Sequence, residues 1–430
     1  MHSGGLVAEG PKVVVVGAGA AGLMAAIHAA KSGARVVLLE RTDDGGRKIL
    51  ISGGGRCNVL PSVARPERFV TASSPNSMKK LLRSWPLEEQ RRFFEEELGL
   101  ALALEPETGK LFPVTNKARD VRDRLVARAR ELGADVWFGA KVKDARRDGD
   151  AWQVALDDGT TIDARAVVLA TGGLSVPQTG SDGIGLAIAR RLGHTVRDTY
   201  PALTPLTATP PVHAPLAGVS LEVTLEAPLP KGRFTSTGGF LFTHRGYSGP
   251  TVLDVSHLAV RARAQGAAQP VLVRWTTLDR DAWDAALRDT TRGATVGSVV
   301  RRALPTRLAD ALIDEARVHA TRPLAELRRE ERTRLVELLA AYPLPWNGDE
   351  GYKKAEVTGG GVALEEIDPK TMQSRLQPGL HLCGEILDAF GPIGGHNFMW
   401  AWATGRQAGL GAAANANADA DADAEEKHSG

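Results

Sequence analysis

The feature that most constrains the fold is a run of glycines placed directly after an apolar segment. Residues 12–16 form a short apolar run typical of a buried strand, and the sequence Gly17-Ala18-Gly19-Ala20-Ala21-Gly22 follows at once. Residues 20–32 have helix-forming composition and end at Gly33, and residues 35–39 are typical of a second strand. This order of elements predicts a βαβ unit and a parallel sheet of the α/β class.

The glycines of this turn have different expected roles. Gly17 permits the tight turn, Gly19 lets the backbone approach a pyrophosphate, and Gly22 allows the helix to pack closely on the strand. The N-terminus of the helix offers free N–H groups and a positive dipole to phosphates. Glu40 ends the second strand 18 residues after Gly22 (40 − 22), where a carboxylate accepts hydrogen bonds from an adenosine ribose. A bound dinucleotide is therefore predicted, but this turn alone does not separate FAD from NAD.

A second glycine-rich segment, residues 45–58, favours FAD. Its cations Arg47, Lys48 and Arg56 are expected to neutralise a pyrophosphate, and the triple glycine 53–55 permits backbone contact with a flat ring. NAD-binding domains usually lack such a loop after their acidic residue. The alternative is a mobile surface loop.

A third segment, residues 382–398, combines a strand, glycine turns and the start of a helix. Glu385, after the strand, is expected to accept a hydrogen bond from a ribityl hydroxyl. A helix that starts near Gly395 would direct its positive end at the O2/N1 edge of a flavin and stabilise the anionic reduced ring. The alternative is a plain strand–turn–helix without a ligand.

The rest of the chain divides by composition. Prolines, threonines and β-branched residues dominate from about residue 200, and a Leu/Ala/Arg-rich helical pattern covers 281–342. The Ala/Asn/Asp-rich end has little to bury and is expected to be disordered. The expected organisation is an FAD-binding domain in two parts (11–198 and 351–412), an inserted β-rich domain (199–278), a helical domain (279–350) and a disordered tail (413–430).

Composition narrows the function classes. Lys and Arg number 53 and Asp and Glu 51, so the net charge of +2 gives no reason to expect nucleic acid or an acidic membrane as a partner. No apolar run approaches the roughly 20 residues that span a bilayer, and no secretory signal pattern opens the chain. The two cysteines, Cys57 and Cys383, lack metal-ligand spacing, so no metal site is expected. A cytoplasmic protein is predicted, with its oligomeric state open.

Together these motifs resemble the BaiN/YhiN family of FAD-dependent flavoproteins, which includes aminoacetone-oxidase-like proteins. The segments that carry the resemblance are 46–58, 170–194, 201–206, 238–256 and 383–409. The resemblance implies non-covalent FAD in a glutathione-reductase-type domain that the C-terminal segment completes, an inserted β-barrel-like domain, a helical domain, and adenine contact by the backbone of Val142. Two departures leave the substrate open: His396 stands where the family usually has tyrosine, and Arg245-Gly246-Tyr247 interrupts the THxGxSGP pattern.

The motifs and the resemblance together define the residues expected to contact FAD. They are Gly17, Gly19, Ala20, Ala21, Gly22, Glu40, Arg41, Arg47, Lys48, Gly54, Gly55, Arg56, Cys57, Asn58, Val142, Thr171, Gly172, Gly173, Gly384, Glu385, Gly394, Gly395, His396, Asn397 and Phe398.

Candidate groups for chemistry are few, because the flavin itself carries the hydride. His244 and His396 are candidate proton donors or polarising groups, and a structural or solvent-facing histidine is the alternative for each. Tyr247 is a candidate hydrogen-bond donor to substrate, or a packing residue in a turn. Cys57 is either redox-active or a small buried packing residue, and packing is the favoured interpretation.

The predicted function is an FAD-dependent oxidoreductase. A hydride passes from NAD(P)H or a small reduced substrate to an unsaturated or carbonyl compound or to dioxygen, as in an NAD(P)H-linked reductase or an amine oxidase. NAD(P)H is expected to dock only transiently. One alternative is a tRNA-modifying flavoprotein, although acidic residues interleave with the arginine pairs 301–302 and 328–329. The other is a flavin-bound redox sensor without turnover.

Overall fold

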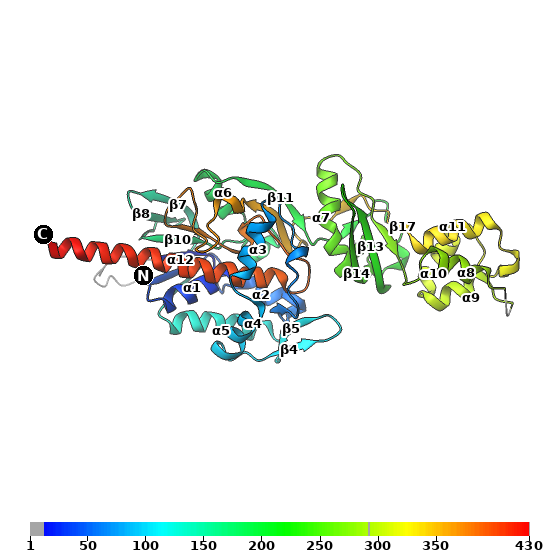
Figure 1. The fold of residues 1–430 in the computed structure, drawn as a ribbon, viewed down its shortest axis with the longest axis horizontal. Helices are drawn as coiled ribbons and strands as arrows, with labels where there is room; N and C mark the ends of the chain where they lie inside the picture. The colour runs from blue at the N-terminus through cyan, green and yellow to red at the C-terminus, as the bar shows by residue number, and fades with distance from the viewer. Residues whose placement is uncertain (1–12, 291–292, 430) are drawn as a thin grey trace. The chain divides into compact units, whose positions relative to one another are not determined.

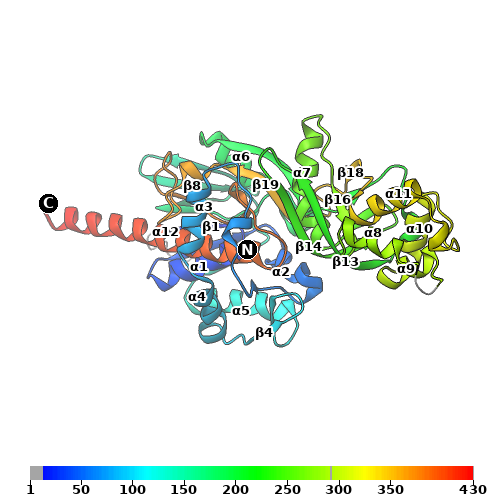
Figure 2. The same ribbon diagram turned by 45° about the vertical axis from the view of Figure 1, so that its right-hand side comes forward.

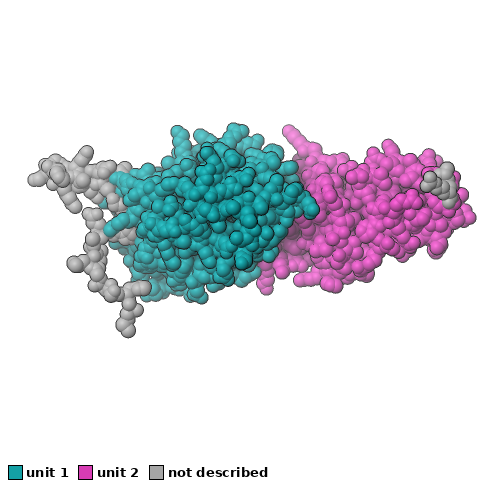
Figure 3. Space-filling view, turned by 90° about the horizontal axis from the view of Figure 1, so that it is seen from below, with its two compact units in different colours: residues 1–199, 357–430 teal, residues 200–356 magenta. Residues whose placement is uncertain are grey.

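The chain forms two compact units in a computed structural model that describes residues 13–290 and 293–429 (Figures 1 and 3). Unit 1 contains the described residues up to 199 and from 357 onward, and unit 2 contains residues 200–356. The two predicted parts of the nucleotide domain therefore come together in unit 1. The inserted segment forms unit 2.

A five-stranded parallel sheet lies at the centre of unit 1. Its order is β20 (Leu380–Leu382), β10 (Ala166–Leu169), β1 (Val13–Val16), β2 (Val36–Glu40) and β6 (Asp135–Phe138). Strand β20 pairs with β10 in parallel, with Leu380 opposite Val167. The predicted α/β class and the completion of the sheet by the C-terminal segment are thus confirmed.

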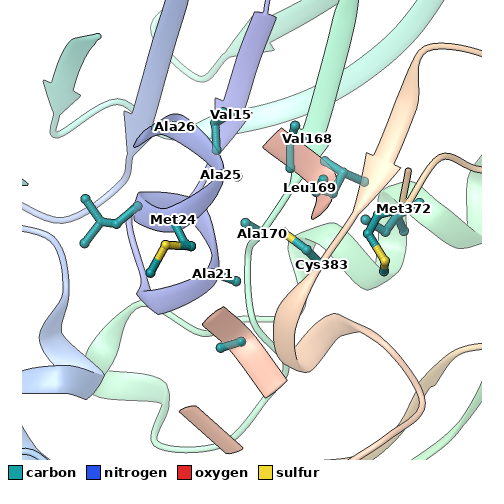
Figure 4. Packing of buried hydrophobic residues seen from close by; sticks show 14 of the residues in the cluster. Val15, Ala21, Met24, Ala25, Ala26, Val168, Leu169, Ala170, Met372 and Cys383 are labelled. Atoms are coloured by element: carbon teal, nitrogen blue, oxygen red, sulfur yellow. The ribbon is translucent and has the colours of Figure 1, made fainter. Parts of the chain in front are cut away.

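The apolar strands of this sheet are buried on both faces. All four residues of β1 and of β10 are inaccessible, as expected of parallel strands that are covered on both sides. Figure 4 shows Ala21, Met24 and Ala25 of helix α1 (Ala20–Lys31) beside Val168 and other core side chains. This packing places the glycine turn at the carboxyl end of β1, the edge where α/β sheets bind ligands.

Glycines of one helix allow two helices of unit 1 to pack closely against each other. Helix α12 (His396–Ser429) lies along α1 in both ribbon views (Figures 1 and 2). A Cβ at Gly405 or Gly409 would overlap the carbonyl oxygen of Ala21 or Ala25, respectively. The absence of these side chains lets the two backbones approach.

Replacing Gly409 with alanine is expected to lower the free energy of unfolding by about 1–3 kcal/mol, because the added methyl group forces the helices apart. Ala414→Val, which adds bulk at an exposed position of the same helix, should cost under about 1 kcal/mol. Denaturant unfolding of both variants checks this. Equal midpoints would show that the crossing does not depend on the glycine.

The C-terminal segment differs from its prediction. Helix α12 continues beyond residue 412, and Ala412, Ala413 and Ala416 are buried. The expectation of disorder is therefore wrong for residues 413–417. Alanine has the highest helix propensity and needs no polar partner, so a low-complexity alanine run can still form a packed helix.

Smaller elements complete unit 1. One three-stranded sheet contains β3 (Leu60–Pro61), β5 (Lys110–Pro113) and β4 (Leu102–Glu105), and another contains β7 (Val142–Asp148), β8 (Ala151–Leu156) and β9 (Thr161–Ala164). A two-stranded sheet pairs β19 (Val357–Val362) with β11 (Val196–Ala202), whose residues 200–202 belong to unit 2. The other α-helices are α2 (Arg47–Ile51), α3 (Pro75–Arg83), α4 (Leu87–Arg92), α5 (Ala118–Glu131) and α6 (Ile184–Arg191). Helices α3 and α4 are separate, since Pro86 between them cannot continue a helix.

Unit 2 contains a seven-stranded antiparallel sheet. Its order is β17 (Tyr342–Pro343), β16 (Leu272–Arg274), β13 (Ser220–Pro228), β14 (Arg233–Phe242), β15 (Gly246–Ser248), β12 (Leu206–Thr207) and β18 (Gly348–Asp349). No pairing between described residues closes this sheet, so the predicted barrel-like domain is an open sheet.

The helices of unit 2 share one core with its sheet. They are α7 (Pro250–Ala264), α8 (Arg280–Arg288), α9 (Val296–Ala303), α10 (Thr306–Glu315) and α11 (Arg329–Ala340). Phe240 and Trp275 of the β-rich segment belong to the same apolar cluster as Trp283, Leu308 and Leu335 of the helical segment. The two predicted inserted domains therefore pack as one unit. Within the described residues, no helix is both long and apolar enough to cross a bilayer.

Candidate functional site

The first glycine turn depends on missing side chains. Gly17 has a φ of +101°, and a Cβ there would lie 2.7 Å from the carbonyl oxygen of Ala170. A Cβ on Gly22 would overlap the Gly17 carbonyl oxygen. Both glycines are thus needed for packing within the protein, as their spacing predicts.

Gly19 differs, because a Cβ there would meet no protein atom within 4 Å. Gly19 caps α1 without any side-chain hydrogen bond, and no acidic residue lies in the first turn. A side chain at this position would therefore enter open space at the N-terminus of α1, whose first N–H groups have no partner within the helix. This arrangement suits a phosphate.

Glu40 ties the turn to the end of β2. Its Oε2 accepts from the backbone N–H of Ala18 at 2.8 Å, and its Oε1 accepts from Thr42 N at 2.8 Å and Thr42 Oγ1 at 2.7 Å. The carboxylate is buried, so these contacts fix its direction. Ribose binding by Glu40 stays a prediction.

The second glycine-rich segment begins with a left-handed turn at Gly45 and Gly46, and Arg122 supports this turn. The Arg122 guanidinium donates to the carbonyl oxygens of Asp44 at 2.9 Å and Gly45 at 3.1 Å. Further along, Gly54 and Gly55 have φ values of +68° and +85°, and a Cβ on Gly54 would meet nothing within 4 Å. The backbone here is open to a flat ligand.

Asn58 joins the second segment to the third. Its side-chain nitrogen donates to Leu60 O at 3.1 Å and its oxygen accepts from Gly395 N at 2.9 Å. Helix α12 holds both sides, because Trp402 donates to Val59 O and Trp400 donates to Gly384 O, each at 3.0 Å. The structure thus brings together two segments more than 300 residues apart in the chain.

The cations of the second segment are paired with acids. Arg47 contacts Asp44 at 2.8 Å, Lys48 contacts Glu385 at 2.6 Å and Arg56 contacts Glu105 at 2.9 Å. Arg41, another predicted contact, pairs with Asp182. Each predicted phosphate-neutralising charge therefore already has a carboxylate partner.

Several other predicted residues lie near these segments. Gly173 leaves room for Thr358, and Gly384 has a φ of +80° beside Ala21. Asn397 holds the turn before α12 by accepting from Gly391 N at 2.8 Å and donating to Gly391 O at 3.0 Å. FAD contact by these residues stays a prediction, as it does for Ala20, Val142 at the start of β7, Thr171, Gly172, Gly394 and Phe398.

Both cysteines of the chain lie in the described part, and both are free and fully buried. Burial raises the pKa of Cys57 to about 12 and also raises the pKa of Cys383. A thiol that stays protonated is a poor nucleophile. These properties favour the packing interpretation of Cys57.

His396 is buried at the N-terminus of α12, with 6% of its surface exposed and its ring centroid 6.2 Å from that of Phe69. Burial, assisted by Arg68 and Arg65, lowers its pKa to about 4. The imidazole is therefore neutral at pH 7. If it donates a proton in turnover, it does so as a neutral N–H group.

This low pKa predicts a pH dependence of stability. The folded pKa lies below the unfolded value of about 6.5, so the contribution is present above pH 6.5 and is lost as the pH falls toward 4. His396→Tyr, which does not titrate there, is expected to reduce the pH slope of the unfolding free energy by up to about 1.4 kcal/mol per pH unit. Urea unfolding of both proteins between pH 7.5 and 5 tests this, and parallel slopes would contradict it.

The other two predicted catalytic residues lie in unit 2. His244 is exposed in the turn between β14 and β15. Tyr247 is fully buried, donates to Pro345 O at 3.1 Å and lies 2.9 Å from Nδ1 of His213. These contacts favour the packing interpretation of Tyr247, and a catalytic role for either residue stays a prediction.

Three further polar side chains make hydrogen bonds to or within the segment 382–398, although the motifs did not single them out. Ser175 and Thr358 both contact Glu385, and Asp388 accepts from Ala72 N at 3.0 Å and Ser73 Oγ at 2.8 Å. Thr358 precedes the triple glycine 359–361, and this run of glycines is the local sequence feature that could have drawn attention to it.

The family model described as the HI0933-like protein Rossmann domain matches residues 11–411. The chain belongs to this family. The resemblance to BaiN/YhiN-type FAD-dependent oxidoreductases is thereby confirmed. The open helix N-terminus at Gly19, the left-handed glycines 54 and 55 and the carboxylates Glu40 and Glu385 fit an FAD molecule.

Two relatives of this HI0933-like protein cover nearly the whole chain. A 3-dehydro-bile acid delta(4,6)-reductase of Clostridium scindens is 31% identical over 93% of this chain and 98% of its own length. A ribosomal RNA dihydrouridine synthase of Escherichia coli is 31% identical over 91% of this chain and 95% of its own length.

Solved structures show the same fold. A flavocytochrome c3 fumarate reductase in its open conformation matches with a TM-score of 0.50 and 19% identity, over 95% of this chain and 79% of the other. The E. coli quinol fumarate reductase matches with a TM-score of 0.50 and 16% identity, over 97% and 74%.

Proposed function

We propose that this protein reduces a carbon–carbon double bond conjugated to a carbonyl group, with NAD(P)H as reductant. The observation that carries the proposal is the type of bond shared by two of its relatives at 31% identity. A 3-dehydro delta(4,6) bile acid has double bonds conjugated to a ring carbonyl. Uridine, the precursor of dihydrouridine, also has a double bond conjugated to a ring carbonyl.

The reaction balances with one hydride and one proton. The hydride from NAD(P)H adds to the carbon distal to the carbonyl, a proton adds to the carbon next to it, and NAD(P)⁺ is released. Bound FAD supplies a ring that accepts a hydride and releases it again. The chain holds the cofactor through the N-terminus of α1 and the glycines of residues 45–58.

Two histidines remain candidates for handling the proton. His396 is neutral and buried, so it suits hydrogen bonding to a carbonyl rather than donation as an imidazolium. His244 is exposed and reaches solvent. The N-terminus of α12 has no acidic residue in its first turn and therefore favours nearby negative charge.

A uracil base in RNA is the second candidate substrate, supported by the ribosomal RNA dihydrouridine synthases of E. coli and Haemophilus influenzae. The charges of unit 2 support it less. Arg301 pairs with Asp310 at 2.7 Å, and Arg332 pairs with Asp284 at 2.8 Å. Such compensated arginines contribute little to the phosphate binding on which RNA affinity depends.

Anaerobic stopped-flow absorbance in the flavin band tests the proposal. FAD-loaded protein is mixed separately with NADH, NADPH and small amines, and the reduced protein is then mixed with a 3-oxo-4-ene steroid or a uridine-containing ribosomal RNA fragment. We expect bleaching by a nicotinamide and reoxidation by at least one conjugated acceptor.

The other outcomes separate the alternatives. Bleaching by amines alone would contradict the proposal and indicate an oxidase. No bleaching, with FAD firmly bound, would contradict it and indicate a redox sensor without turnover. Reoxidation by RNA alone, with RNA affinity that falls steeply with salt, would select the RNA substrate.

A further inference from the structure

Lys48 differs from the other cations of residues 45–58 in where its partner lies. Arg47 pairs with Asp44, three residues away, and Arg56 pairs with Glu105 of the adjoining small sheet. Lys48 instead contacts Glu385, 337 residues further along the chain. Its ion pair therefore joins helix α2 to the segment that follows β20.

The carboxylate of Glu385 is held by four donors besides any ligand. Its Oε1 accepts from Thr358 N at 3.0 Å, from Thr358 Oγ1 at 2.9 Å and from Ser175 Oγ. Its Oε2 accepts from Lys48 Nζ at 2.6 Å. Since each carboxylate oxygen offers about two lone pairs, Oε1 is saturated while Oε2 keeps room for one more donor.

The Glu385 carboxylate and the groups that donate to it contact one another closely. Lys48 Nζ also donates to Ser175 Oγ at 2.7 Å, so the ammonium holds both the carboxylate and one of its donors. A Cβ on Gly173 would overlap Thr358 Oγ1 and lie 3.1 Å from Glu385 Oε1. The side chain of Glu385 is 16% exposed and that of Lys48 28% exposed, so solvent still reaches the pair.

We propose that Lys48 is a positioning residue for FAD rather than a phosphate ligand. It fixes Glu385 so that the remaining lone pair of Oε2 accepts a hydrogen bond from a hydroxyl of the ribityl chain. Ser175 and Thr358 complete this function by holding the other oxygen. The proposal rests on FAD binding and is independent of the reaction proposed above.

Binding of FAD and of ADP to the apoprotein separates the two roles, because ADP carries both phosphates but no ribityl chain. Tryptophan fluorescence is the readout, and turnover is not needed. If Lys48 positions Glu385, Lys48→Met should weaken FAD binding about tenfold or more, the effect of losing a hydrogen bond to a charged group, and change ADP binding less than about twofold. Glu385→Gln should behave alike, and the double variant should be no weaker than the worse single variant.

Arg47→Met is the matched control, since it removes the neighbouring cation of the same helix without touching Glu385. Equal losses of FAD and ADP affinity in Lys48→Met would assign Lys48 to the phosphates and overturn the proposal. Unchanged affinity for both ligands would overturn it as well. Loss of both ADP binding and the circular dichroism signal would show that Lys48→Met does not fold. Lys48→Gln then serves for the same comparison. Equal losses of FAD and ADP affinity in Lys48→Gln would again overturn the proposal.

Discussion

Replacing Gly19 with valine is expected to abolish FAD binding while the chain folds almost as stably as the wild type. A Cβ at this position meets no protein atom within 4 Å, and the backbone φ of −78° suits any residue. Valine is a poorer helix N-cap than glycine, which costs about 1 kcal/mol or less. The valine side chain instead enters the open space beside the N-terminus of α1, where a pyrophosphate is predicted to bind.

The expected loss of FAD affinity is at least about hundredfold, because a buried clash of this kind costs several kcal/mol. Flavin absorbance after gel filtration and fluorescence titration with FAD measure it, and thermal unfolding of the apoproteins measures stability. Retention of stoichiometric FAD by Gly19→Val would place the phosphates elsewhere.

Gly22→Ala is the matched comparison, since its Cβ would overlap the Gly17 carbonyl oxygen inside the protein. In this variant the free energy of unfolding is expected to fall by about 2 kcal/mol or more, and FAD binding is expected to be lost as well. Two glycines of one motif therefore separate a requirement of the ligand from a requirement of the fold. Equal apoprotein stabilities for both variants would contradict that distinction.

Local sequence pattern was sufficient for the first βαβ unit and for the order of the main elements. A buried parallel strand is continuously apolar, and a glycine turn follows it only where backbone must come close to something, so β1, α1 and β2 lie within one or two residues of their predicted bounds. The return of the C-terminal segment to the nucleotide domain was indicated by the glycine-rich segment 382–398 and by the change of composition after the insertion, and the resemblance to a known family implied it as well.

Partners of charged side chains could not be predicted in the same way. The residue types at Arg47, Lys48 and Arg56 indicate positive charge beside a phosphate site, but a sequence does not show which carboxylate will lie 3 Å away. The roles of Ser175 and Thr358 could not be predicted for the same reason, because the sequence does not show which acceptor a hydroxyl group will contact. The Lys48–Glu385 contact is therefore the observation from which the positioning role of Lys48 is proposed.

Composition gave wrong secondary-structure predictions for two segments whose conformation depends on how they pack. Helix α7 lies within the segment that was expected to be β-rich because of its prolines and β-branched residues. Proline is, however, also favoured at the first position of a helix, where Pro250 stands. The alanine-rich end of α12 was expected to be disordered because it offers few large apolar groups. Small residues are what the close crossing with α1 requires.

Replacing Asn58 with leucine is expected to lower the free energy of unfolding of the apoprotein by about 2–4 kcal/mol. The leucine side chain has a similar branched shape, but it leaves the Gly395 N–H and the Leu60 carbonyl without their partner in a buried place, at about 1–3 kcal/mol each. Because these bonds join the second glycine-rich segment to the third, FAD affinity should fall with stability. Denaturant unfolding and FAD titration measure the two effects.

Asn58→Asp tests whether both bonds matter, because an ionised aspartate still accepts from Gly395 N–H but turns a lone pair toward the Leu60 carbonyl. That repulsion and the burial raise the folded pKa of the new carboxyl above its unfolded value of about 3.9. With a raised folded pKa, the contribution is fully present below about pH 3.9 and is lost as the pH rises through the folded pKa. The stability gap between Asn58→Asp and the wild type should therefore be narrower at pH 5 than at pH 8. A gap that does not change with pH would mean that the donor to Leu60 contributes nothing, and that of the two Asn58 bonds only the one from Gly395 joins the segments.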